Sequence, residues 1–202
     1  YQNKINISGG TFASNDENVN IFLEGGYAYA GNSYENVVTI TGGNFELDIE
    51  GACAWYGNVY DNTVNINGGT FAGEICGGYS GHGDVYGNIV NINGGTFIGD
   101  ETFTLNLYDS DREVASIIVK GGTFKGFDPA NNLAEGPNTN FVAEGYKSVY
   151  NEAKNTYTVV ARDAADNVTN EEDLRYHMLN GGTVKLGSDI ELAEKSIGLS
   201  KD

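Results

Sequence analysis

The chain has 202 residues, including 29 glycines, two prolines and 11 basic residues, and its formal net charge is −17. The basic residues are scattered, and binding to a phosphate backbone needs clustered Lys and Arg, so we expect no nucleic-acid partner. No run of about 18 apolar residues occurs, and we therefore expect no membrane insertion. The chain lacks a starting Met and a signal-peptide pattern, and we interpret it as a piece of a longer protein with neighbouring domains.

From the N-terminus onward, one short phrase recurs five times, first at residues 5–12. Its later versions occupy residues 38–45, 64–71, 90–97 and 117–124, and the glycine pairs inside them are 33, 26, 26 and 27 residues apart. Self-similarity at such a period indicates a solenoid, because a unit this small buries its apolar face only by stacking on its neighbours.

Each phrase alternates like a β-strand around its glycine pair. Positions −4, −2 and +3, counted from the first glycine, are apolar in every unit and form three columns. The columns are Ile5, Val38, Val64, Val90 and Ile117; Ile7, Ile40, Ile66, Ile92 and Val119; and Phe12, Phe45, Phe71, Phe97 and Phe124. Strand alternation predicts that all three columns point inward, with equivalent residues of successive parallel coils about 4.8 Å apart.

A second strand is predicted after each of the first four phenylalanines, at residues 21–23, 46–50, 74–76 and 102–107. The expected fold is therefore all-β: a parallel β-helix, or solenoid, of about five coils that spans residues 1–127.

The period stops after Phe124. Residues 128–139 are predicted to be a loop, and residues 141–150 and 156–161 alternate like the two strands of a hairpin. An open last coil would expose unpaired edge groups, so we expect the loop and hairpin, residues 128–162, to cap the solenoid.

Residues 163–202 are predicted to form one short helix and short strands. Thr169 or Asn170 is a suitable N-cap, acidic residues fill the first turn, and a glycine pair follows the last turn. Residues 183–186 and 190–192 are then predicted to be strands. So small an element hardly folds alone, and we expect it either to pack on the hairpin or to begin a following β-helix domain.

The repeats resemble the right-handed parallel β-helix proteins, the pectate-lyase-like superfamily in the broad sense. The phrase Ile-Asn-Gly-Gly-Thr-Phe is similar to that of GGTF-repeat surface proteins of gut bacteria and their phages. Residues 121–129, 140–147 and 157–160 are similar to the segment that closes such β-helices. The resemblance implies a right-handed coil and an extracellular location, on a bacterial cell surface or a virion. It implies no single activity, because the fold hosts lyases, hydrolases, adhesins and fibres alike.

A column of aromatic residues at position −8 runs beside a column of asparagines at position −6. The aromatic column is Tyr34, Tyr60 and Tyr86, and the asparagine column is Asn36, Asn62 and Asn88. Further aromatic residues and one histidine lie near both columns in the sequence: Tyr27, Tyr29, Trp55, Tyr56, Tyr79 and His82. Rings beside amides suit a polysaccharide groove, since sugar faces stack on rings and hydroxyls pair with amides. The alternative is that these side chains stack from coil to coil and hold the turns. We prefer the structural role for the asparagines, and both interpretations stay open for the aromatic residues and His82.

Two groups of acids are further candidates. Glu24 and Glu50 align on neighbouring coils, and a glycosidase needs two carboxylates about 5–9.5 Å apart, although Cys76 takes the equivalent place in the next coil. Asp109, Asp111 and Glu113 alternate along one loop, where their oxygens would either bind Ca²⁺ or face solvent. We prefer the solvated loop and expect no cofactor, with Ca²⁺ as the alternative.

The two cysteines, Cys53 and Cys76, fall three positions out of register when the coils are aligned. Three strand residues span roughly 10 Å, which is too far for a disulfide between adjacent coils. We therefore predict two buried or half-buried free thiols.

These patterns favour a non-enzymatic, surface-exposed repeat module, a stalk or adhesin, that binds glycans or a host-surface polysaccharide on its Tyr/Trp face. The alternative is a polysaccharide lyase or glycoside hydrolase, including a phage tail-spike depolymerase. Lyases of this fold use an Arg or Lys base, and the repeats hold one arginine, Arg112, and three lysines, Lys4, Lys120 and Lys125, so the non-enzymatic role is preferred. A homo-oligomer is compatible with either role.

Overall fold

The computed structural model describes residues 2–14, 21–98, 105–106, 116–134, 136–181 and 183–193. The chain divides into two compact units, Tyr1–Val160 and Ala161–Asp202, which are described separately. Of residues 105, 106 and 116 only the backbone is described.

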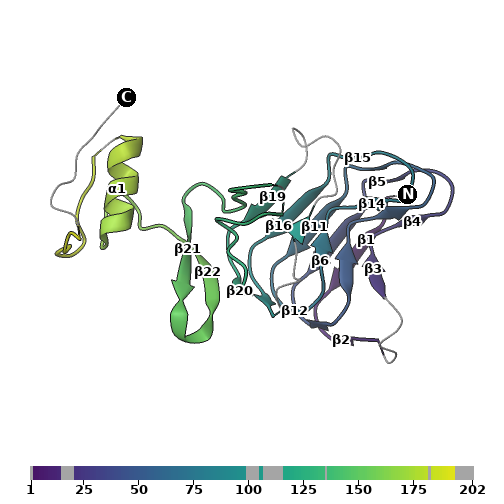
Figure 1. Cartoon of the computed structure of the whole chain (residues 1–202), viewed down its shortest axis with the longest axis horizontal. Helices are drawn as coiled ribbons and strands as arrows, with labels where there is room; N and C mark the ends of the chain where they lie inside the picture. The colour runs from purple at the N-terminus through teal and green to yellow at the C-terminus, as the bar shows by residue number, and fades with distance from the viewer. Residues whose placement is uncertain are drawn as a thin grey trace. The chain divides into compact units, whose positions relative to one another are not determined.

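The first unit is a parallel β-solenoid (Figure 1). Five strands stack in one sheet in chain order: β1 (Lys4–Ile7), β6 (Val37–Ile40), β11 (Thr63–Ile66), β16 (Ile89–Ile92) and β19 (Ser116–Val119). Every neighbouring pair is parallel and joins equivalent repeat positions, as where Ile40 pairs with Ile7 on one side and Ile66 on the other. The all-β solenoid predicted from the repeats is confirmed.

The solenoid makes about three turns, so the prediction of five coils was wrong. Five copies of a phrase delimit only four intervals along the chain. The fourth interval, between β16 and β19, contains residues outside the described ranges. Counting phrases therefore overestimated the number of turns.

Each turn continues through further short strands. The phenylalanine phrase forms β2 (Thr11–Phe12), β7 (Asn44–Phe45), β12 (Thr70–Phe71), β17 (Thr96–Phe97) and β20 (Thr123–Lys125). The predicted second strands are β3 (Phe22–Glu24), β8 (Asp48–Glu50), β13 (Ile75–Cys76) and β18 (Leu105–Asn106). Both sets pair in parallel from turn to turn.

Two additional sets of strands close the turns. They are β4 (Tyr27–Ala28), β9 (Cys53–Ala54) and β14 (Tyr79–Ser80), and β5 (Ser33–Tyr34), β10 (Val59–Tyr60) and β15 (Val85–Tyr86). The sequence pattern did not predict them, because two residues are too few to show an alternation.

The three apolar columns fill the interior as predicted. From Val38 onward their members are buried and belong to one hydrophobic cluster, while Ile7 and Phe12 of the first turn are half-buried. The phenylalanine rings stack face to face along the solenoid, with centroid separations of 4.8, 5.1, 5.2 and 4.4 Å. A smaller cluster of Ala52, Ala54, Val59 and Val85 fills another part of the turn.

The asparagine column is a buried ladder. Asn36, Asn62 and Asn88 have no solvent exposure. Oδ1 of Asn62 accepts bonds from the backbone N–H and Nδ2 of Asn36, and Oδ1 of Asn88 accepts the same two bonds from Asn62. The side-chain oxygens of Asn62 and Asn88 therefore accept from the neighbouring turn and link successive turns. This column is structural and offers nothing to a ligand.

The last turn is covered by the predicted hairpin, formed by β21 (Tyr146–Asn151) and β22 (Thr156–Ala161) around the 3-10 turn Glu152–Lys154. Strand β22 pairs antiparallel with β20 and so extends the phenylalanine sheet. The first hairpin strand starts later than predicted, because the segment before it lies along β19: the N–H of Val119 donates to the carbonyl of Phe141. Phe141 and Val159 are buried against the main cluster and close it.

The second unit contains helix α1 (Glu171–Asn180). Asn170 is its N-cap and Gly181 its C-cap, as the sequence indicated. Asp173 is the buried residue of this helix and forms an ion pair with Arg162 at 2.8 Å. The strands predicted at residues 183–186 and 190–192 were wrong: within 183–193 the structure has one isolated bridge, Leu186 to Val168, and no strand. Among the described residues, no helix combines the length and apolarity needed to cross a membrane.

Candidate functional site

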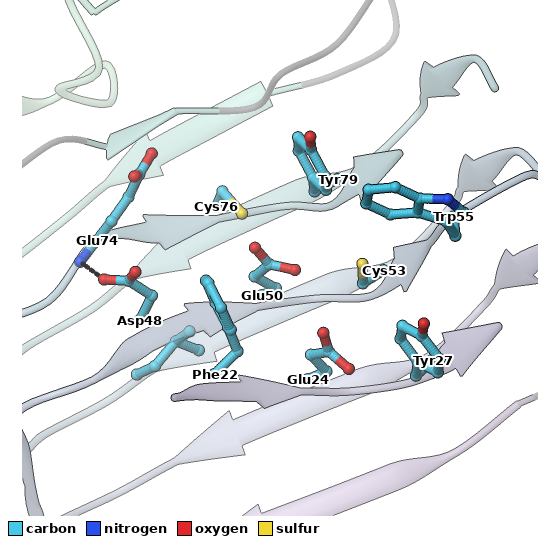
Figure 2. Close-up of a pocket in the computed structure, with 11 residues that line it drawn as sticks. Phe22, Glu24, Tyr27, Asp48, Glu50, Cys53, Trp55, Glu74, Cys76 and Tyr79 are labelled. Carbon is cyan, nitrogen blue, oxygen red and sulfur yellow. Dashed lines mark hydrogen bonds between the residues drawn. The ribbon is translucent and has the colours of Figure 1, made fainter. Parts of the chain in front are cut away.

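A pocket of about 560 Å³ lies over strands β3, β8 and β13 and the ladder β4, β9 and β14 (Figure 2). Its lining combines three kinds of side chain: the acids Glu24, Asp48, Glu50 and Glu74; the aromatic residues Phe22, Tyr27, Trp55 and Tyr79; and the thiols of Cys53 and Cys76, with Ile49 beneath. The volume is in the range of pockets that bind small ligands.

Strand alternation explains why polar groups gather here. Leu23, Ile49 and Ile75 sit in register on β3, β8 and β13 and pack in the core. The next residue on each strand therefore points to the opposite, outer face. Glu24, Glu50 and Cys76 occupy these positions and are register partners, as the alignment of the repeats predicted.

Glu24, Glu50 and Cys53 form the closest group in the pocket. One carboxylate oxygen from each glutamate and the Sγ of Cys53 all lie within 4.8 Å of one another. The thiol therefore lies beside both carboxyl groups. Oε2 of Glu50 is buried and has no hydrogen-bond partner. Such an atom is costly unless something else in the pocket binds it.

Burial shifts the ionisation of all three groups. Burial, together with repulsion from Glu24, Asp48 and Glu74, raises the pKa of Glu50 to about 7. Burial also raises the pKa of Glu24. Burial and the two neighbouring glutamates raise the pKa of the Cys53 thiol to about 12.

The described lining residues include four carboxyl groups and no Lys, Arg or His. The electrostatic field of the pocket therefore disfavours anionic ligands and favours neutral or cationic ones.

The aromatic side chains surround these acids. Tyr27 and Tyr79 are the register partners of Cys53 on the two adjacent turns, and Trp55 follows β9. Figure 2 shows the three rings beside the carboxyl groups of Glu24 and Glu50. Their exposed fractions are 56% for Tyr27, 42% for Trp55 and 39% for Tyr79, so all three rings offer surface to a ligand.

Three more of the candidate aromatic residues continue outward from Trp55. His82 meets Trp55 edge to face at 5.5 Å and stacks on Tyr56 at 5.0 Å, and Tyr29 meets Tyr56 edge to face. Tyr29 and Tyr56 are exposed, so this group extends the aromatic surface beyond the pocket lining.

The column Tyr34, Tyr60 and Tyr86 does not line the pocket. Its members are on β5, β10 and β15, and their rings stack in parallel at 5.0 and 4.9 Å. This geometry fits the alternative of a ladder that stabilises the turn. Of the aromatic residues proposed from the sequence, the structure brings Tyr27, Trp55 and Tyr79 into the pocket.

The sequence pattern missed several lining residues. Phe22, Asp48 and Glu74 were placed in strands but were not proposed for the site, and the cysteines were treated as structural. Both thiols are free and buried, as predicted. Glu74 could have been found from its register, because it follows Asp48 by one repeat period of 26 residues. In the structure the N–H of Glu74 donates to Oδ1 of Asp48 at 2.7 Å (Figure 2). The proposed calcium ligands Asp109, Asp111 and Glu113 lie outside the described residues.

No protein-family model, no curated protein and no solved structure matches the chain. The pocket is therefore interpreted from its own geometry and chemistry.

Proposed function

We propose that the chain is a non-enzymatic repeat module that binds a glycan in the pocket over β3, β8 and β13. The observation that carries the proposal is the exposure of Tyr27, Trp55 and Tyr79 directly beside carboxyl groups. The apolar faces of sugars stack on such rings, and their hydroxyls donate to carboxylate oxygens. The parallel backbone pairing under the pocket holds these side chains in fixed positions, which reduces the ordering cost of binding.

The charge of the pocket narrows the class of glycan. Four carboxyl groups line it and the chain carries a net charge of −17, so polymers rich in uronic acid or sulfate are repelled. Neutral glycans and amine-bearing glycans are the expected ligands.

The setting of the module is part of the proposal. The resemblance of the phrase Ile-Asn-Gly-Gly-Thr-Phe to GGTF-repeat surface proteins supports an extracellular location, on a bacterial cell or a virion, and a right-handed winding of the pectate-lyase-like kind. In that setting the module would act as a stalk or adhesin within a longer chain, alone or as a homo-oligomer.

A second candidate, a glycoside hydrolase or tail-spike depolymerase, has one observation in its favour. The nearest carboxylate oxygens of Glu24 and Glu50 are within 4.8 Å, and retaining glycosidases place their two carboxyl groups roughly 5–5.5 Å apart. A lyase has less support, because the described pocket lining offers no basic residue to abstract a proton.

A glycan array followed by titration calorimetry tests the binding proposal. Trp55→Ala and Tyr79→Ala should each weaken binding by roughly tenfold, about 1.4 kcal/mol. Tyr60→Ala is the matched control, since it removes a ring from outside the pocket and should leave affinity unchanged. Failure of the wild-type chain to bind any neutral or amine-bearing glycan would overturn the proposal.

Incubation with the bound polysaccharide and analysis of the products separates the two candidates. Intact polymer supports the binding module. Chain cleavage that disappears in both Glu24→Gln and Glu50→Gln would establish the hydrolase instead.

A further inference from the structure

The carboxyl group of Glu50 is an unusual polar group among the described residues of the first unit. The residue is 8% exposed, and its Oε2 is buried without a hydrogen-bond partner. Figure 2 shows this carboxyl group directed into the pocket, between the strands that carry Glu24 and Cys76. A buried oxygen of this kind calls for a partner that the pocket lining does not itself supply.

The groups around Glu50 favour a cation as the partner of its Oε2. The carboxylate of Glu24 and the thiol of Cys53 converge with Glu50 on one point, with ligating atoms within 4.8 Å of one another. No described lining residue carries a positive charge. Both carboxyl groups can therefore be ionised together only when a cation bound from solution balances their charge.

We propose that Glu24, Glu50 and Cys53 form a binding site for a divalent transition-metal ion, with Zn²⁺ the best-suited ion. Zn²⁺ is bound tetrahedrally by sulfur and carboxylate ligands at about 2.0–2.3 Å. Three protein ligands leave a fourth position for water or for an oxygen of a ligand, and the pocket lies directly beside it. Ca²⁺ fits less well, since it takes 6–8 oxygen ligands and thiolates favour softer ions.

The geometry requires a small adjustment. Ligand atoms around tetrahedral Zn²⁺ lie about 3.3–3.8 Å apart, given those bond lengths. The three atoms lie within 4.8 Å of one another, so they must approach by no more than about 1.5 Å. The thiol loses its proton on ligation, so binding releases a proton.

The test uses the whole chain, reduced and stripped of metal, without any glycan, so that its outcome is independent of the proposed function. Titration calorimetry with ZnCl₂ should give one ion per chain. Co²⁺ should give the near-ultraviolet absorption of a thiolate–cobalt bond. This measurement on the wild-type chain needs no variant, and absence of the thiolate band would overturn the proposal.

Single-residue variants identify which side chains bind the metal ion. Cys53→Ser and Glu50→Gln should each weaken Zn²⁺ binding by about tenfold or more. Glu74→Gln and Cys76→Ser are matched controls, because they change the same groups in the same pocket outside the three ligands, and both should lose clearly less affinity than the ligand variants. Undiminished binding by Cys53→Ser, or equal loss in Cys76→Ser, would overturn the assignment. Circular dichroism confirms that each variant is folded.

Discussion

Nδ2 of Asn36 donates a hydrogen bond to Oδ1 of Asn62, 2.9 Å away on the next turn, and neither side chain is exposed to solvent. The same oxygen accepts the backbone N–H of Asn36 at 3.0 Å. One side-chain oxygen thus satisfies two buried donors of the neighbouring turn. Because buried donors are costly when unpaired, this ladder fixes the register of successive turns as well as their separation.

Asn62→Ala should destabilise the first unit by about 2–4 kcal/mol, since it removes the acceptor of the buried backbone N–H of Asn36 and one of the two acceptors of its Nδ2. Asn67→Ala is the control: it removes the acceptor of a similar 2.9 Å bond from Asn93, but on the exposed surface, and should cost less than about 1 kcal/mol. Urea denaturation followed by circular dichroism measures both. Equal losses would show that the buried ladder has no special role.

Phe71→Ala should destabilise the unit by about 3–5 kcal/mol, because Phe71 is buried between Phe45 at 5.1 Å and Phe97 at 5.2 Å. Phe12→Ala removes the same side chain from the half-buried first position of the stack and should cost clearly less. The comparison is again made by urea denaturation. A larger loss for Phe12 than for Phe71 would contradict a continuous aromatic interior.

Gly68→Ala should destabilise the solenoid by about 1–3 kcal/mol, because a Cβ there would lie 2.7 Å from the carbonyl oxygen of Thr41 on the preceding turn. Gly9 holds the equivalent position in the first turn, where a Cβ would meet no atom within 4 Å. Gly9→Ala should therefore leave the melting temperature nearly unchanged. A pair of variants with the same melting temperature would refute the steric explanation for the repeated glycine.

Glu50 should make the stability of the metal-free chain fall as pH rises from about 4.5 to about 7. Burial raises the pKa of Glu50 from its ordinary value of 4.5 to about 7 in the folded chain. Below this window the carboxyl is protonated in both states, and within it only the unfolded chain releases the proton, which favours unfolding by up to about 3 kcal/mol. Denaturation of wild type and Glu50→Gln in a chelating buffer isolates the effect. Identical pH profiles for the two proteins would rule it out.

The repeat period predicted much of the fold and part of the candidate site. The inward columns followed from alternation around the glycine pair, and the register of Glu24 with Glu50 followed from aligning the repeats. Parallel stacking makes this possible, since a residue and its equivalent one period later must lie on adjacent strands. The number of turns did not follow, because repeated phrases are boundaries of turns and not turns themselves.

The sequence by itself determined which residues stack on one another. Residues one repeat period apart occupy equivalent positions on successive turns of a solenoid. Only the tertiary structure decided which columns share one pocket: Tyr27, Trp55 and Tyr79 line a pocket together with Glu50, while the column of Tyr60 stacks on separate strands. That grouping depends on how sharply the chain bends between the short strands within a turn. The bends are set by packing around small residues such as Ala52 and Ala54 and by close backbone contacts at glycines, and no spacing in the sequence encodes these angles.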